Sequence, residues 1–214
     1  LNIQLQNNQL TGAIPPGLFE ANIKLAHLYL YNNHLSGSIP PELGKLTDLR
    51  KILLNGNLLS GAIPTSLTRL EALYSERSDF GHNALTAEGE ALLAFLHDKD
   101  PDWAETQTVP PTHLVVTPLS SGSVRLSWDP IPYTADGGGY RVLMGSDKGG
   151  PYTFVGQTAD KSCSSLDLTR LLPGEVRALV VQTVTDAHAG NPNRVFSTFS
   201  QEVQAVCLVQ PHTV

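Results

Sequence analysis

The sequence predicts a two-part chain: a solenoid of the α/β class with a short parallel β-sheet and a C-terminal capping helix, followed by an all-β sandwich. Three observations predict it. A motif recurs every 24 or 25 residues in the first part, a helical segment follows where this period stops, and short alternating β-branched runs fill the remainder. The expected parts are repeats at 1–86, helix and proline-containing linker at 87–111, sandwich at 112–208 and a tail at 209–214.

The repeated motif occurs in three clear copies. They read IQLQNNQLTGAIP, LYLYNNHLSGSIP and ILLNGNLLSGAIP and begin at Ile3, Leu28 and Ile52. A fourth, degraded copy, SDFGHNALTA, places Asn83 at the position of the motif's asparagine. Because successive side chains of a strand point to opposite faces, leucine or isoleucine at alternate positions predicts one inward face per strand.

Three residue types recur in each copy and have structural roles. The asparagine side chains can satisfy backbone groups that a sharp turn leaves unpaired, and would stack as a ladder. The glycines permit turn conformations and the prolines end strand pairing. These positions are Asn8, Asn33, Asn57 and Asn83; Gly12, Gly37 and Gly61; and Pro15, Pro40 and Pro64.

On these motifs, residues 1–86 resemble leucine-rich repeats of the plant-type subclass. That subclass has the pattern LxxLxLxxNxLSGxIPxxLxxLxx and also occurs in bacterial surface proteins. The resemblance implies a solenoid in which the leucines, the asparagine ladder and the Gly-x-Ile-Pro turns form the scaffold and carry no chemistry.

The strand positions that alternate with the leucines face the concave side of such a solenoid, where ligands commonly bind. Exposed tyrosines there suit binding, since they offer a large area with few rotors and a polar tip. A merely solvated face is the alternative. The candidate binding residues are Gln4, Gln6, His27, Tyr29, Tyr31, Lys51, Leu53, Asn55, Arg77 and Asp79, with Asn2 and Gly81 at equivalent positions.

Leu1 lies inside a repeat, and no capping element precedes it. An uncapped solenoid end would leave an apolar face open to water. We therefore expect the chain to be a fragment of a longer repeat protein, or this face to be covered by another chain through self-association.

The segment TAEGEALLAFLHDKDPDW predicts a helix with Thr86 as its N-cap and with Glu88 and Glu90 in its first turn. This helix would close the C-terminal end of the solenoid. Its predicted apolar face comprises Leu92, Leu93, Phe95 and Leu96.

After the helix, Asp98, Asp100 and Asp102 have the spacing that opens a calcium-binding loop. However, Trp103 and Val109 stand where such a loop needs glycine and glutamate. We interpret the aspartates as part of a solvated linker and Trp103 as packing at the junction between domains. The following TQTVPPT predicts a short, semi-rigid spacer, and no metal or cofactor site is expected.

From Thr112 onward, turn clusters separate seven short runs, which is typical of an antiparallel sandwich. The segments VRLSWDPIP and LLPGEVRALVVQTV resemble a fibronectin type III domain. The resemblance implies a core tryptophan at Trp128, an aromatic residue at Tyr140 and a strand corner formed by Leu171, Pro173 and Gly174. Arg177 stands where the family usually has the corner tyrosine. The family's strand order would place Cys163 and Cys207 at opposite ends of the sandwich, too far apart for a disulfide.

Composition and motifs argue against several functions. The seven histidines lie outside any HExxH or Gly-x-Ser-x-Gly motif, and the net charge of −6 comes without a basic stripe for nucleic acid. No run of eighteen apolar residues predicts a membrane span. We expect no enzyme.

The two resemblances together imply a non-catalytic recognition or adhesion module that is secreted or displayed on the cell surface. It would bind a protein or glycan through the concave face, with the sandwich as a spacer or second contact. The absence of N-x-Ser/Thr sequons favours a bacterial source over a plant receptor. Two alternatives remain: a structural subunit of a surface layer or fibre, and an accessory module of a larger secreted enzyme.

Overall fold

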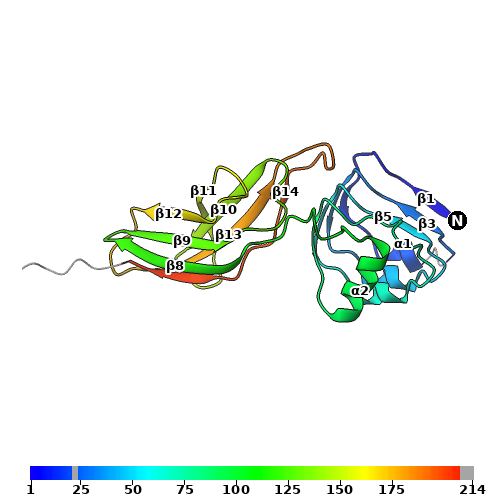
Figure 1. Ribbon diagram of the computed structural model, residues 1–214, viewed down its shortest axis with the longest axis horizontal. Coiled ribbons are helices and arrows are strands. Elements are labelled where there is room, and N and C mark those ends of the chain that lie inside the picture. Colours follow the sequence, from blue (N-terminus) through cyan, green and yellow to red (C-terminus); the bar gives the residue numbers. More distant parts are fainter. Residues whose placement is uncertain (21–23, 208–214) are drawn as a thin grey trace, which may run out of the picture. The chain divides into compact units, whose positions relative to one another are not determined.

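The computed structural model describes residues 1–20 and 24–207, which form two compact units (Figure 1). The first unit comprises Leu1–Val109 together with Asp186–Phe196. The second comprises Pro110–Thr185 and the described part of Ser197–Val214. The predicted tail at 209–214 lies outside the described residues.

Two parallel sheets run through the repeats of the first unit. One contains β1 (Asn2–Gln4), β3 (His27–Tyr29) and β5 (Lys51–Leu53), in that order. The other contains β2 (Thr11–Ala13), β4 (His34–Gly37), β6 (Leu58–Ala62) and β7 (Ala84–Thr86). The first three repeats therefore each supply one strand to each sheet, and Figure 1 shows β1, β3 and β5 side by side.

Short helical turns complete the repeats. They are α1 (Gly17–Glu20), η1 (Pro41–Lys45) and η2 (Thr65–Arg69). Pro40 and Pro64 precede η1 and η2 with φ of −65° and −64°, so the Ile-Pro steps turn the chain out of the strand as predicted. The leucines and isoleucines of the strands and turns form one buried cluster.

An amide ladder connects consecutive repeats. The Oδ1 atoms of Asn33, Asn57 and Asn83 accept the backbone N–H of Leu10, Leu35 and Leu59 at 3.0, 3.0 and 3.1 Å. Their Nδ2 groups donate to carbonyls of their own repeat and of the preceding one. Asn8 is exposed, and its Nδ2 donates within its own turn, to the carbonyls of Leu5 and Gln6.

Gln107 extends this ladder by one rung. Its Oε1 accepts the N–H of Leu85 at 2.9 Å, and its Nε2 donates to the carbonyls of Phe80 and Trp103. Gln107 and Thr108 are only 2% and 1% exposed. The prediction of a spacer for this stretch is therefore wrong at residues 107–108, because a glutamine amide performs the task of the motif's asparagine.

Helix α2 (Glu90–Lys99) follows β7 and begins later than predicted. Thr86 is the last residue of β7, and the N-cap is Gly89, whose φ of 89° suits glycine. Leu92 and Leu96 are buried in the repeat cluster and Phe95 packs against it, but Leu93 is exposed. The predicted Thr86 cap and the inclusion of Leu93 in the apolar face are thus wrong, since the chain completes a strand before the helix starts.

The first unit also contains residues 186–196, which sequence reasoning assigned only to the sandwich. Asn191 Nδ2 donates to the carbonyls of Asn57 and His82 at 2.8 and 2.7 Å. Asn193 Nδ2 donates to the carbonyl of Asn33 at 2.7 Å. Both side chains are buried and satisfy carbonyls of the ladder turns. β14 (Val195–Phe196) ends this segment.

The second unit is an antiparallel sandwich. One sheet has the order β12 (Ser165–Thr169), β9 (Ser123–Asp129) and β8 (Thr112–Ser120). In the other, β10 (Gly138–Gly145) lies between β11 (Thr153–Gln157) and β13 (Val176–Thr185), and β15 (Val203–Val206) pairs with β13. The seventh predicted run is divided between β14 and β15.

Trp128 and Tyr140 form the centre of the sandwich core, with ring centroids 5.2 Å apart. The Tyr140 hydroxyl accepts the Ile131 N–H at 2.8 Å and donates to the Lys161 carbonyl at 3.0 Å. At the strand corner, Arg177 forms an ion pair with Glu175 at 2.5 Å. The predicted core aromatic residues are therefore buried, and the corner holds a charged pair where the family usually has a tyrosine.

Neither Cys163 nor Cys207 forms a disulfide. Of the helices in residues 1–20 and 24–207, none is long and apolar enough to cross a membrane.

Replacing a buried rung of the ladder should destabilise the first unit. Asn57→Ala leaves the buried N–H of Leu35 without its acceptor. It also removes one of the two asparagine donors to each of the carbonyls of Leu30 and Leu54, which keep their bonds from Asn33 and Asn83. We expect a loss of about 3 kcal/mol in the free energy of unfolding. Urea unfolding followed by Trp103 fluorescence in a Trp128→Phe background measures it, because Trp103 packs on the repeat core.

Asn8→Ala is the matched control, since Asn8 is the exposed member of the same ladder series. It should cost less than about 1 kcal/mol. Equal losses in the two variants would show that the buried ladder bonds are not what stabilises the repeats.

Candidate concave face and acidic cavity

The parallel register aligns the candidate binding residues in rows across the repeats. The first row is Asn2, His27 and Lys51, and the second is Gln4, Tyr29 and Leu53, extended to Asp79 by a single bridge. Backbone bonds beyond the strands continue the register into a third row. That row contains Gln6, Tyr31, Asn55 and Gly81.

The first two rows share a small cluster around Tyr29. His27 Nδ1 lies 2.8 Å from Asn2 Oδ1, and the His27 and Tyr29 rings are 5.9 Å apart. The Lys51 ammonium lies 5.7 Å from the centre of the Tyr29 ring, which allows a cation–π contact. His27, Tyr29 and Lys51 are half-buried, so they form a pre-arranged surface of imidazole, aromatic and cationic groups.

The third row contains two enclosed oxygens without partners. Gln6 Oε1 and Asn55 Oδ1 are buried and have no hydrogen-bond partner. The register places Tyr31 between them. A buried polar atom without a partner costs about 1–3 kcal/mol.

Arg77 lies two residues before Asp79, outside the paired strands. It is exposed, and its guanidinium lies 5.9 Å from the centre of the Tyr74 ring. The fourth repeat pairs with β5 only through the bridge between Leu53 and Asp79, so no paired strand holds Arg77 in line with Lys51.

A small acidic cavity lies beside Asp79. It has a volume of about 170 Å³, and its principal lining residues are Ser78, Asp79, His82, Asp100, Asp102 and Thr106. Backbone groups anchor two of the carboxylates: Asp79 Oδ1 accepts the Gly81 N–H at 2.9 Å and Asp100 Oδ2 accepts the Phe80 N–H at 2.7 Å. The carboxylates are thus held in place by the fourth repeat.

Burial and mutual repulsion raise the pKa of two of these groups. Burial is the main cause that raises the pKa of Asp100 to about 7. The hydrogen bond from the Phe80 N–H lowers this pKa, whereas the neighbouring Asp79 and Asp102 raise it further. Burial also raises the pKa of Asp79, with the Gly81 N–H and Lys51 acting in the opposite direction and Asp102 adding to the rise. Negative charge in this cavity is therefore costly without a cation.

The interpretation of Asp98, Asp100 and Asp102 as a solvated linker is wrong for Asp100, which is only 4% exposed. Its carboxylate turns inward to satisfy a backbone N–H of the fourth repeat. The sequence carries no clear signal for this, because neighbouring aspartates look alike in a run of acidic residues. Among residues 1–20 and 24–207, no group of three or more His, Cys, Asp or Glu side chains could hold a metal ion.

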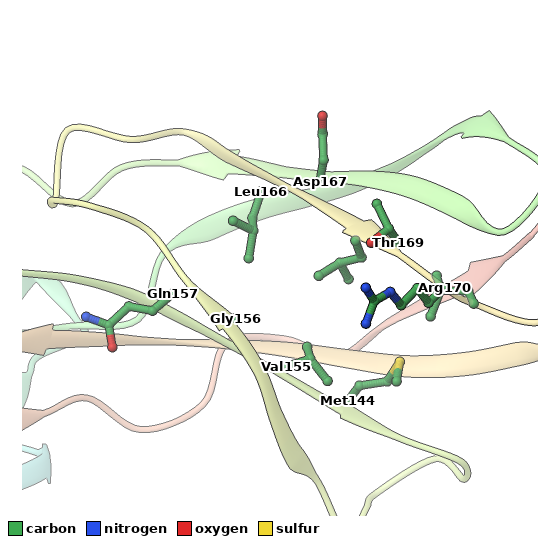
Figure 2. A pocket seen from close by; sticks show the side chains of 10 residues that line it. Met144, Val155, Gly156, Gln157, Leu166, Asp167, Thr169 and Arg170 are labelled. Atoms are coloured by element: carbon green, nitrogen blue, oxygen red, sulfur yellow. The ribbon is translucent and has the colours of Figure 1, made fainter.

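The sandwich has a larger hollow of about 410 Å³ between β11 and β12. Figure 2 shows Met144, Val155 and Leu166 directed into this space, while the Asp167 carboxylate points away from it. Asp167 is paired with Arg125 at 2.7 and 2.8 Å. The hollow therefore has a mixed lining, which also includes Arg170, and the carboxylate at its edge is already engaged.

Comparison with protein families matches residues 2–59 to the leucine rich repeat model. Those residues are similar to leucine-rich repeats. Comparison with curated protein sequences finds no match. The second unit is an antiparallel sandwich, as its resemblance to fibronectin type III domains implied, and the match at residues 2–59 supports leucine-rich repeats in the first unit.

Solved structures resemble parts of the chain. The plant peptide hormone receptor RGFR1 in complex with RGF2 is 40% identical over 39% of this chain and 13% of that chain, with a TM-score of 0.37. The ectodomain of GASSHO1/SCHENGEN3 from Arabidopsis thaliana, in complex with CASPARIAN STRIP INTEGRITY FACTOR 2, is 31% identical over 44% of this chain and 11% of that chain, with a TM-score of 0.37. A Fn3-like protein from Clostridium thermocellum is 23% identical over 49% of this chain and 98% of that chain, with a TM-score of 0.38.

The stability of the first unit should fall as pH rises from about 4 to 7. The folded state holds a proton on Asp100 up to about pH 7, whereas the unfolded chain loses it near 3.8, so the folded state loses stability between these two values. We expect Asp100→Asn to remove a pH-dependent loss on the order of 2–4 kcal/mol. The amide oxygen that this substitution introduces can still accept the Phe80 N–H.

Urea midpoints of both proteins at pH 5 and pH 7.5, read from Trp103 in the Trp128→Phe background, test this. The titrating groups outside the cavity are common to both proteins, so the difference between them reports Asp100 together with its coupling to Asp79 and Asp102. An unchanged pH dependence in Asp100→Asn would contradict the assignment.

Proposed function

We propose that this chain is a non-catalytic protein-interaction module that binds its partner on the concave face of the leucine-rich repeats. The observation that carries the proposal is the third row, where two enclosed, unpartnered oxygens flank the half-buried Tyr31. The cluster of His27, Tyr29 and Lys51 supports it, since aromatic rings with polar tips and a nearby cation are common in binding surfaces.

Several finer features belong to the same proposal. The partner is a protein or a glycan, and the sandwich acts as a spacer or second contact. Helix α2 closes one end of the solenoid, as the burial of Leu92 and Leu96 in the repeat core supports. The plant-type subclass, a bacterial source, a secreted or cell-surface location and self-association through the first repeat are further parts of this hypothesis.

The test compares two tyrosines of the same unit. Partners are first selected on protein and glycan arrays probed with the full chain. Tyr31→Ala should then weaken binding at least about ten-fold, because it removes a contact residue from the centre of the face. The unfolding midpoint should change little, since Tyr31 is only half-buried.

Tyr74→Ala is the matched control. Tyr74 is 44% exposed and contacts Arg50 and Arg77 outside the three rows. It should leave the affinity unchanged. Equal affinity of Tyr31→Ala and the unmodified chain for the selected partner would refute binding on the concave face.

A further inference from the structure

We propose that the acidic cavity of the fourth repeat binds a cationic side chain, a guanidinium or an ammonium, of a basic residue in the partner. This inference rests on the proposed function, because it names the chemistry by which the concave face selects its ligand. The cavity continues that face, since Asp79 and Gly81 are members of the second and third rows and also line the cavity.

The charge of the cavity is unbalanced. Asp79, Asp100 and Asp102 line it, and no ion pair among the described residues engages any of them. Lys51 influences Asp79 only as a neighbouring charge. Carboxylates that are partly removed from water and face one another favour a bound cation, because its charge offsets both their repulsion and their lost hydration.

Ser78 independently indicates a ligand. It lines the cavity, is 7% exposed, and its hydroxyl has no hydrogen-bond partner. A hydroxyl group can accept an N–H bond, so a multi-donor cation would satisfy Ser78 and the carboxylates together.

The available groups suit a side-chain cation better than a calcium ion. Calcium requires six to eight oxygen ligands, whereas one oxygen each of Asp79 and Asp100 already accepts a backbone N–H. A guanidinium or ammonium can use the remaining lone pairs through charge-assisted hydrogen bonds. The cavity volume of about 170 Å³ accommodates such a group.

The second row gives the spacing of the expected partner. Tyr29 and Asp79 are separated by β5, so they lie about 10 Å apart at the usual distance between strands. An extended peptide covers this span in about three residues. A peptide that contacts Tyr29 therefore places a basic side chain at the cavity about three residues away along its own chain.

The experiment uses the full ¹⁵N-labelled chain and titrates it with Nα-acetyl-argininamide or Nα-acetyl-lysinamide. The neutral comparison is Nα-acetyl-citrullinamide, which has nearly the shape of the arginine probe without its charge. We expect saturable shifts of the Ser78, Gly81 and His82 amide signals with one or both cationic probes. The citrulline probe should bind at least about five-fold more weakly.

Matched variants assign the effect to the cavity. Asp79→Asn and Asp102→Asn keep side-chain size and should each weaken the cationic probe roughly five-fold or more, while Ser78→Ala should weaken it about three-fold. Asp98→Asn is the control. Asp98 belongs to the same segment, but its carboxylate is paired with Lys99 and does not line the cavity. It should leave binding unchanged.

Three outcomes would overturn the inference: no saturable shift with either cationic probe, equal binding of the citrulline probe, or saturable binding of Ca²⁺ at the same amides that excludes the arginine probe.

The partner assay separates this inference from the proposed function. If Tyr31→Ala weakens partner binding while Asp79→Asn and Asp102→Asn do not, the concave face is supported and the cationic contact is refuted. If the two aspartate variants weaken the partner and Tyr31→Ala does not, the cavity is supported and the three-row binding face is refuted.

Discussion

The amide ladder is the interaction on which the rest of the first unit depends. After each strand of the β1-β3-β5 sheet the chain turns, and the turn leaves N–H and C=O groups that need side-chain partners. Asn33, Asn57, Asn83 and Gln107 satisfy these groups in the same way in successive repeats. Because each rung bonds both its own repeat and the preceding one, the ladder also sets the register between repeats.

That register creates the candidate binding face. Rows form only when equivalent positions of successive strands lie opposite one another, and a shift of one residue would exchange the leucines with the tyrosines. Tyr29 meets Lys51 and His27 for this reason, and Tyr31 lies between Gln6 and Asn55. The same register brings together the two oxygens without partners, Gln6 Oε1 and Asn55 Oδ1, on either side of Tyr31.

The acidic cavity forms where the segment after α2 packs beside the fourth repeat. The fourth repeat forms one bridge with β5 and pairs β7 with β6, and the segment after α2 supplies side-chain partners to its backbone groups. Gln107 continues the ladder, while Asp100 accepts the Phe80 N–H. Because Asp100 points inward, it lies in one cavity with Asp79 and Asp102. The residue that satisfies a backbone group of the fourth repeat therefore also makes the cavity acidic.

The sequence by itself determined the repeat period, the inward leucines, the ladder positions and the core role of Trp128 and Tyr140, because each follows from local periodicity or a recurring motif. It placed Tyr29 and Tyr31 on the outward positions for the same reason. Only the tertiary structure decided that Gln107 is a rung, that Gly89 rather than Thr86 precedes α2, that Asp100 is buried, and that Asn191 and Asn193 bond the turns of the repeats. Most of the backbone groups that the polar side chains among these residues satisfy lie 20 to 160 positions away in the chain, and no local pattern shows which side chain will meet them.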